Sequence, residues 1–287
     1  MPELPEVEVV RQGIHEYVVG KTISKITVHH PRAVRRQTGG EREFISRLKN
    51  RTVVDTKRRG KFMWLVLDND EALVTHLGMS GQVLIQPLKS QPEKHLRVRT
   101  TFTEGDYAMH FVDQRTFGWM TVEELTEDPN QIVVPECALH IAQDPLDPLW
   151  NRQATIELIK AKQTQIKRVL LDQTAISGIG NIYADEALWL AQIHWGSPAN
   201  SLSNIQIDDL LNKATQVMRE ALAVGGTSFD ALYVNVNGES GYFSRDLNAY
   251  GREGEPCNRC GAPIVREHFM NRSSFSCPVC QNLSTER

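Results

Sequence analysis

Long apolar runs are missing from this sequence of 287 residues, and their absence limits where the protein can act. No stretch approaches the roughly 20 apolar residues that a membrane-spanning helix needs, which excludes a protein anchored by such helices. The first eight residues are acidic where a secretory signal is basic, and no apolar segment follows them. We therefore expect a cytoplasmic protein without a membrane partner.

A positive excess is missing as well. The formal net charge is -3, whereas nucleic-acid-binding proteins usually carry surplus positive charge. However, residues 31–61 contain eleven Lys or Arg and three acids, a net charge of +8, which leaves -11 for the rest of the chain. Such segregation is typical either of a basic groove for a phosphate backbone or of a solvated basic face without a partner. Charge alone does not distinguish the two.

Cysteine is scarce, yet four of the five cysteines form two closely spaced pairs. Cys257 and Cys260 are separated by two residues, as are Cys277 and Cys280, and sixteen residues lie between the pairs. This spacing predicts one structural Zn2+ ion held by four thiolates, with no coordination position left for a substrate. Two disulfides are the alternative, but they require an oxidising compartment, which the missing signal disfavours. Cys137 is expected to be a bystander thiol.

The periodicity of the chain changes along its length and predicts an α+β multidomain fold. Residues 5–17 have apolar side chains at helical spacing, and residues 22–122 contain short β-rich runs separated by turns. We expect a domain over residues 2–130 in which a leading helix precedes a two-layer β-sandwich. The prolines of residues 131–150 predict a linker.

Helical periodicity returns after residue 150, so we expect a helical domain over residues 151–249, followed by a zinc-binding domain over residues 250–287. Gly178 and Gly180 lie between two helical segments of the second domain. Their turn either leaves helix N-terminal amides facing an anion or simply joins two helices.

Four separated motifs occur in one order along the chain. They are Pro-Glu-Leu-Pro-Glu-Val-Glu at residues 2–8, His-Leu-Gly-Met-Ser-Gly at 76–81, Gly-Ile-Gly-Asn-Ile-Tyr-Ala at 178–184, and Tyr-Gly-Arg-Glu-Gly at 250–254 before the cysteine pairs. In these motifs, and over essentially its whole length, the chain resembles the formamidopyrimidine-DNA glycosylases, the bacterial Fpg or MutM branch of the Fpg/Nei family. The resemblance implies a helix-two-turn-helix in the second domain and a zinc-finger β-hairpin at the end.

The resemblance also implies a bifunctional DNA glycosylase and AP lyase that excises 8-oxoguanine and formamidopyrimidines in base excision repair. With Met1 removed, the Pro2 amine would attack the anomeric carbon, form a Schiff base and cut the strand by β,δ-elimination. An N-terminal amine suits this attack because it titrates at about pH 8, well below a lysine. Glu3 would transfer protons, Lys61 would contact phosphates and assist the centre, and Glu6 would support the site.

The implied partner is double-stranded DNA that contains a damaged base. Met79, Arg115 and Phe117 match the family's wedge, which fills the gap left by the extruded nucleotide, and Arg115 would face the orphaned cytosine. Four residues would grip phosphates without reading sequence, namely His76, Lys162, Asn181 and Arg272. Residues 233–243 match a loop that caps the extruded base. Gln114 and Thr116 depart from common family residues, so the resemblance does not fix the local geometry of the wedge loop.

Three alternatives stay open at this point. An endonuclease VIII type glycosylase for oxidised pyrimidines shares the nucleophile and the zinc hairpin, but it typically has Gly where Leu4 stands and uses other wedge residues. A catalytically silent damaged-DNA-binding protein has no need of Pro2, Glu3 and Lys61 together. A zinc-ribbon transcription factor leaves roughly the first 250 residues unexplained. No heptad or self-complementary apolar stripe is present, so we expect a monomer.

Overall fold

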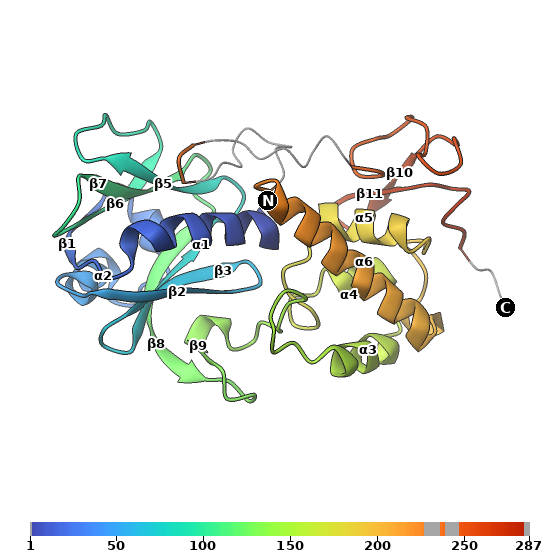
Figure 1. Ribbon diagram of the computed structural model, residues 1–287, viewed down its shortest axis with the longest axis horizontal. Helices are drawn as coiled ribbons and strands as arrows, with labels where there is room; N and C mark the ends of the chain where they lie inside the picture. The colour runs from blue at the N-terminus through green and yellow to red at the C-terminus, as the bar shows by residue number, and fades with distance from the viewer. Residues whose placement is uncertain (1, 227–235, 239–246, 284–287) are drawn as a thin grey trace. The chain divides into compact units, whose positions relative to one another are not determined.

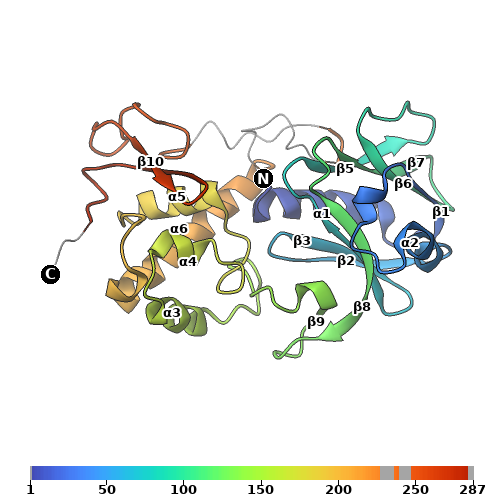
Figure 2. The ribbon, with the colours of Figure 1, turned by 180° about the vertical axis from the view of Figure 1, so that it is seen from behind.

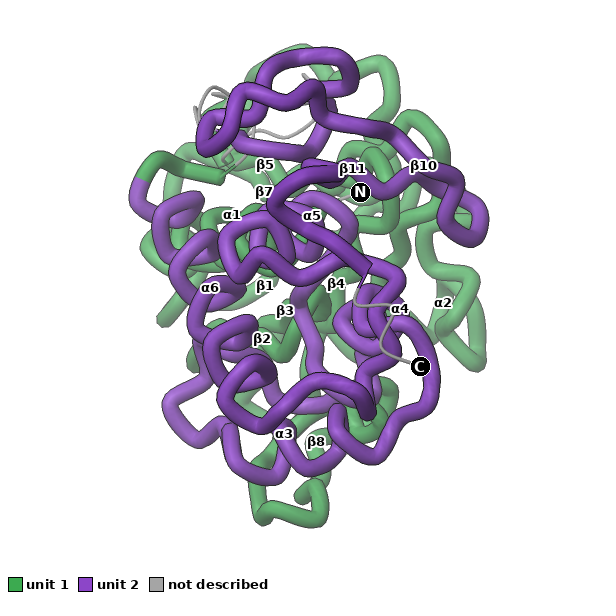
Figure 3. The backbone as a smooth tube through the Cα atoms, turned by 90° about the vertical axis from the view of Figure 1, so that its right-hand side faces the viewer, with its two compact units in different colours: residues 1–140, 224–242 green, residues 141–223, 243–287 purple. Residues whose placement is uncertain are grey.

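The structure, a computed structural model, describes residues 2–226, 236–238 and 247–283. The chain forms two compact units (Figure 3). The first consists of residues 1–140 and 224–242, and the second of residues 141–223 and 243–287. The division after residue 140 falls inside the segment that the sequence predicts to be a linker.

Two antiparallel β-sheets form the first unit (Figure 1). One has the strand order β1-β6-β7-β5 and the other β2-β3-β4-β8-β9. Their bounds are β1 Ile23–Val28, β2 Val53–Arg59, β3 Phe62–Leu67, β4 Glu71–His76, β5 Gly81–Pro87, β6 Leu96–Phe102, β7 Tyr107–Asp113, β8 Trp119–Glu127 and β9 Val133–Pro135. Buried apolar side chains from both sheets meet in one core, which confirms the predicted two-layer sandwich.

Helix α1 (Leu4–Val18) confirms the predicted N-terminal helix. Its apolar residues recur every three or four positions, and this stripe is buried in the core of the sandwich, as Val7, Val10, Ile14 and Val18. Pro5 lies in the first turn, where its missing N–H costs no helical hydrogen bond. The helix start is therefore fixed by the same residues that form the first motif.

Two elements differ from the sequence-based expectation. Helix α2 (Gly40–Leu48) interrupts the region predicted to be all β, and only Phe44 and Leu48 of its nine residues are buried. Two apolar positions among charged ones are too weak a pattern to separate from the surrounding basic segment. Strand β9 pairs with β8 inside the expected linker of residues 131–150, followed by a short helix η2 (Glu136–Ala138). Proline is tolerated on such an edge strand, so it does not exclude pairing.

The second unit contains helices and one β-hairpin, as the sequence predicts (Figure 2). The helices are α3 Arg152–Ala161, α4 Ile166–Leu170, α5 Asn181–Leu190 and α6 Asn204–Ala223, and the hairpin strands are β10 Val265–Phe269 and β11 Arg272–Ser276. Two short helices, η1 (Pro31–Val34) in the first unit and η3 (Ala199–Ser201) in the second, complete the described elements. None of the helices in the described ranges is both long and apolar enough to cross a membrane.

Candidate active site and nucleic-acid interface

The start of α1 is buried and contains two acidic side chains. Pro2, Glu3 and Glu6 are all buried. Glu3 is the residue that precedes the helix, and its backbone N–H donates to Glu6 Oε2 at 2.8 Å. Because Glu6 holds this backbone from within the first turn, Pro2 is attached to a fixed anchor. Glu6 thus fixes the backbone directly after Pro2, which is the kind of support expected of it.

Lys61 lies in the two-residue turn between β2 and β3, and it is buried. Gly60 precedes it with a positive φ of 55°, which a tight hairpin turn favours. The adjacent Arg58 donates through Nε to Glu8 Oε2 at 3.0 Å, and Arg58 Nη1 donates to Gly60 O at 3.1 Å. The Glu8–Arg58 pair therefore ties the Lys61 turn to α1, close to the first motif.

His76 is the last residue of β4, and its ring packs against two aromatic rings. Its imidazole lies parallel to the Trp119 indole at 5.6 Å between centroids, and the Phe62 ring meets it edge-on at 4.9 Å. Burial lowers the pKa of His76 to about 4, and the positive charges of Lys61 and Arg36 add to the shift. The Gly78 N–H donates to His76 Nδ1 at 3.1 Å, so the neutral ring carries its proton on Nε2. His76 can therefore offer a phosphate a hydrogen bond, but no charge.

The three residues predicted to form the wedge lie on two connections that cross between the sheets. β4 joins β5 through residues 77–80, and β7 joins β8 through residues 114–118. Met79 is 40% exposed and Phe117 48% exposed. Arg115 Nη1 lies 3.9 Å from Met79 Sδ. The structure thus brings all three predicted wedge residues together at the surface of the first unit.

A buried carboxylate fixes both connections. Asp113 is fully buried and accepts hydrogen bonds from the Gly118 N–H at 2.7 Å and the Arg115 N–H at 3.1 Å. The Ser80 hydroxyl, on the other connection, also donates to Asp113. At Gly78, a Cβ would lie 2.5 Å from Gly118 N, so only glycine lets the two connections approach this closely. Sequence reasoning missed Asp113 and Ser80, because only the β5–β7 register reveals that they meet.

The basic segment at residues 31–61 is less available for DNA than its composition suggests. Four of its eleven basic residues face carboxylates, in the pairs Arg47–Glu71, Arg51–Asp68, Arg58–Glu8 and Arg59–Asp128. Arg32, Arg35 and Arg36, in or just after η1, form no ion pair within the described residues.

In the second unit, Asn181 is the first residue of α5, directly after the glycine-rich turn. Its Nδ2 donates to Ser273 O at 2.9 Å, and Ser273 follows Arg272 at the start of β11. Asn181 therefore joins the turn to the zinc hairpin and places Arg272, whose side chain is exposed, in its neighbourhood. Lys162 is exposed at the end of α3, and no contact described here links it to the other two.

A buried ion pair strengthens this junction, and the sequence analysis missed it. Lys167 Nζ on α4 lies 2.6 Å from Asp185 Oδ1 on α5, and both side chains are completely buried. Lys167 Nζ also donates to Ser274 Oγ at 2.7 Å, and the Phe275 N–H donates to Asp185 Oδ2 at 3.1 Å. The available signal was a pair of acids, Asp185 and Glu186, within an otherwise apolar helix, because buried acids require partners.

Glu186, the second of these acids, holds the chain just before the cysteine pairs. Its carboxylate accepts from three successive backbone N–H groups, those of Asn248, Ala249 and Tyr250, at 2.8 to 2.9 Å. Burial raises the pKa of Glu186, and these N–H groups oppose the shift. The segment that leads into the fourth motif, and its first residue Tyr250, are therefore tied to α5 through their backbone N–H groups.

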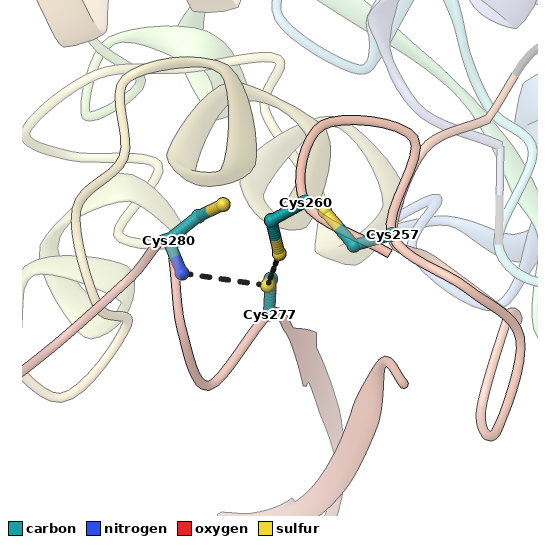
Figure 4. Close-up of side chains that lie close together, drawn as sticks. All are labelled: Cys257, Cys260, Cys277 and Cys280. Carbon is teal, nitrogen blue, oxygen red and sulfur yellow. Dashed lines mark hydrogen bonds between the residues drawn. The ribbon is translucent and has the colours of Figure 1, made fainter. Parts of the chain in front are cut away.

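The four paired cysteines converge at the end of the chain (Figure 4). Their Sγ atoms all lie within 4.8 Å of one another. Tetrahedral zinc with Zn–S bonds of about 2.3 Å places neighbouring sulfurs about 3.8 Å apart, so the cluster fits the ion. The Arg259 and Cys280 N–H groups donate to Cys257 Sγ and Cys277 Sγ, as expected around thiolates. These cysteines form a structural zinc site, and all five cysteines of the chain are free of disulfides.

Two expectations fall outside the described residues. They are the state of Met1, and the capping loop of residues 233–243 apart from residues 236–238. Within residues 236–238, Val236 is buried in the core of the first unit, and its carbonyl accepts a hydrogen bond from the Ile85 N–H at 2.8 Å.

Three family models match the chain in succession. They are the formamidopyrimidine-DNA glycosylase N-terminal domain at residues 1–120, the formamidopyrimidine-DNA glycosylase H2TH domain at residues 141–232, and a zinc finger found in FPG and IleRS at residues 254–283. The last model covers all four zinc-site cysteines. The order of the models is that of the sandwich, the helices and the zinc hairpin.

Relatives and solved structures agree with these models. A formamidopyrimidine-DNA glycosylase of Thermobifida fusca is 55% identical over 98% of this chain and 97% of its own length, and one of Mycolicibacterium smegmatis is 56% identical over 98% and 97%. The Lactococcus lactis Fpg in complex with abasic-site DNA has a TM-score of 0.84 and 30% identity, covering 98% of this chain and 99% of that one. On this identity and coverage, the chain belongs to the formamidopyrimidine-DNA glycosylase family.

Proposed function

We propose that the protein is a bifunctional DNA glycosylase and AP lyase that removes 8-oxoguanine and formamidopyrimidines from double-stranded DNA. The observation that carries the proposal is the buried start of α1, where Pro2 and Glu3 precede a backbone fixed by Glu6. A relative that is 55% identical over 97% of its own length is named formamidopyrimidine-DNA glycosylase, and solved relatives hold abasic-site or Fapy-dG DNA. The protein acts as a monomer on chromosomal DNA in the cytoplasm.

Pro2 is the nucleophile, once Met1 has been removed. Its nitrogen forms a bond to the anomeric carbon while the glycosidic bond breaks, and the base leaves with the bonding electrons and takes up a proton. The sugar then opens to an iminium ion, which acidifies the neighbouring C–H bonds. Loss of one such proton expels the 3′ phosphate, and a second elimination expels the 5′ phosphate. A secondary amine at the chain start suits this role because a useful fraction is unprotonated at neutral pH.

Glu3 and Lys61 assist this chemistry. The Glu3 carboxyl protonates the ring oxygen as the sugar opens and later accepts a proton during elimination. Lys61 contributes positive charge beside the phosphates of the damaged nucleotide, and the Glu8–Arg58 pair keeps its turn next to α1. Glu6 is a positioning residue, since its carboxylate accepts a hydrogen bond from the backbone N–H of Glu3.

The wedge and the phosphate contacts prepare the DNA for this attack. Extruding a nucleotide costs a few kcal/mol of stacking, which Met79 and Phe117 recover by filling the gap. Arg115 offers donors to the acceptor atoms of the orphaned cytosine. His76, Lys162, Asn181 and Arg272 contact phosphates, and the zinc ion supports Arg272 by holding the ends of its hairpin.

The direct test is strand cleavage by the full-length, zinc-loaded protein. We expect duplexes with 8-oxoguanine opposite cytosine to be cut with phosphates at both ends of a one-nucleotide gap. Duplexes that contain an oxidised pyrimidine are the comparison. Preferential cutting of the pyrimidine duplex assigns the protein to the endonuclease VIII type, and binding without cutting leaves a silent damage-binding protein.

A further inference from the structure

We infer that Arg35 is a positioning residue that holds the wedge loop, residues 115–118, in the conformation needed to enter the DNA duplex. The inference rests on the proposed wedge role of Met79, Arg115 and Phe117. Arg35 is distant in sequence from the wedge loop, and we assign it no contact with the sugar or the base.

The single guanidinium of Arg35 donates hydrogen bonds to several backbone carbonyls of the wedge loop. Nη1 donates to Gly118 O at 2.8 Å and, more weakly, to Thr116 O at 3.4 Å, and Nη2 donates to Phe117 O at 2.8 Å. Nη1 also donates to Arg32 O at 2.8 Å, within its own short helix region. Arg35 therefore joins η1 to three successive residues of the wedge loop.

The wedge loop needs this external support. Thr116 has a φ of 54°, and this left-handed conformation is unfavourable for a β-branched residue. Such strain persists only where the surroundings enforce it. The Asp113 carboxylate accepts hydrogen bonds from the N–H groups of Arg115 and Gly118. The Arg35 guanidinium donates to the carbonyls of Phe117 and Gly118. A negative carboxylate thus holds the N–H groups of the wedge loop, and a positive guanidinium holds its carbonyls.

The neighbouring arginine provides a contrast. Arg36 lies over the Trp119 ring, with its guanidinium carbon 4.4 Å from the ring centroid. Within the described ranges it makes no hydrogen bond or ion pair. Arg35 and Arg36 carry the same charge one residue apart, but only Arg35 contacts the wedge loop. A comparison of the two therefore separates the loss of a charge from the loss of the loop contacts.

Loosening the loop has a specific consequence. Arg115 distinguishes the orphaned cytosine from another base only if its backbone is fixed, and Phe117 can enter the stack only as a rigid side chain. Without Arg35, the protein is expected to discriminate less between 8-oxoguanine opposite cytosine and 8-oxoguanine opposite adenine. The chemistry at Pro2 is expected to remain.

The experiment compares Arg35→Gln with Arg36→Gln, using the full-length, zinc-loaded protein and Phe117→Ala as the reference for a damaged wedge. Single-turnover excision rates on the two duplexes give the ratio of cytosine to adenine selectivity. A 2-aminopurine beside the orphaned base reports insertion of the wedge by its fluorescence. Borohydride trapping on a single-stranded abasic oligonucleotide, where no wedge is needed, reports the Pro2 chemistry.

We expect Arg35→Gln and Phe117→Ala both to lower the 2-aminopurine signal, and Arg35→Gln to reduce the selectivity ratio about tenfold, the effect of losing charge-assisted hydrogen bonds. Trapping should stay within about twofold of the original protein. Arg36→Gln should change neither signal nor ratio. Arg35→Lys, which keeps the charge but not the fork of donors, should be intermediate, and it serves as the test if Arg35→Gln does not fold.

Two results overturn the inference. If Phe117→Ala lowers the signal while Arg35→Gln and Arg35→Lys behave like Arg36→Gln, the wedge exists but Arg35 does not position it. If Phe117→Ala also leaves the signal and the selectivity unchanged, the proposed wedge itself is wrong, and the role of Arg35 fails with it.

Discussion

His76 carries no charge at pH 7, because burial and the nearby charges of Lys61 and Arg36 lower its pKa to about 4. A neutral histidine cannot attract a phosphate by its charge, so in the proposed phosphate contact His76 acts as a hydrogen-bond donor. The ring is clamped between Phe62 and Trp119, and its Nδ1 is already occupied by the Gly78 N–H. Its Nε2–H is thus held in one direction, as a positioned donor whose strength does not vary over the physiological pH range.

This environment predicts a pH-dependent contribution to stability. The unfolded protein binds a proton at His76 below about pH 6.5, whereas the folded protein does so only below about pH 4, so protonation favours unfolding and stability falls as pH decreases between these values. Between pH 7.5 and pH 5 the loss attributable to His76 is about 2 kcal/mol. Urea unfolding at both pH values should show that His76→Gln loses about this much less than the original protein.

The same comparison removes the main confounding effect. Acid also displaces zinc from its thiolates, but it does so equally in the original protein and in His76→Gln. An equal loss of stability in both proteins contradicts the neutral state assigned to His76.

At the residue scale, the sequence predicts side chains that belong to contiguous motifs. Pro2 and Glu3 lie within one motif, and the zinc-site cysteines have a spacing that only metal ligands commonly show. Arg35 and Asp113 could not be predicted in this way, because their importance depends on backbone groups about eighty residues away or on a strand register. A lone arginine in a basic segment carries no local sign of what it contacts.

At the scale of elements, α4, α5 and the zinc hairpin are joined by a buried polar network. Lys167 and Asp185 form its centre, and Asn181 adds the contact to Ser273 next to Arg272. Burial raises the pKa of Asp185 to about 7, while Lys167 opposes the shift. Burying two charges costs desolvation free energy, so the network contributes more to positioning these elements than to the stability of the fold.

This arrangement predicts a marked asymmetry between single and double substitutions. Lys167→Met leaves Asp185 buried without its ionic partner and should lower the free energy of unfolding by about 3–5 kcal/mol. The double variant Lys167→Met with Asp185→Leu should recover most of that loss, because no charge is left buried. Urea unfolding measures both.

The control is an exposed pair in the same unit. Glu253 and Arg266 are 3.5 Å apart with more than half of each side chain exposed, so Glu253→Gln should cost less than about 1 kcal/mol. A cost for Lys167→Met no greater than that of Glu253→Gln contradicts the role of the buried pair.

Most elements follow from the sequence pattern. Strand β6 alternates between buried and half-buried positions, β3, β4 and β7 are short, mostly buried runs, and α1 has a regular apolar stripe, so these elements are visible without a structure. The exceptions are α2, with two buried residues, and β9, with three residues that include a proline. Both are short, and both are held by tertiary packing against the sandwich, which single-sequence patterns do not contain.

For the whole molecule, net charge is a poor guide to the partner. The average of -3 conceals a basic segment, and the structure shows that at least four of its eleven basic residues pair with carboxylates of the protein itself. What points to DNA is the set of proposed local sites: a wedge on two neighbouring connections, a neutral histidine donor, and a helix start joined to a zinc hairpin. The first family model covers His76 and the proposed wedge residues, the second covers the start of α5, and the third covers the zinc hairpin.

The central claim is that Pro2 forms the covalent bond to the damaged nucleotide. We would incubate the protein with a duplex that holds 8-oxoguanine opposite cytosine, add borohydride, and locate the trapped adduct by peptide mass analysis. The account predicts an adduct on the peptide that begins with Pro2, and its near disappearance in Pro2→Gly. An adduct on a lysine such as Lys61, or cleavage of the duplex with no adduct at the chain start, would contradict it.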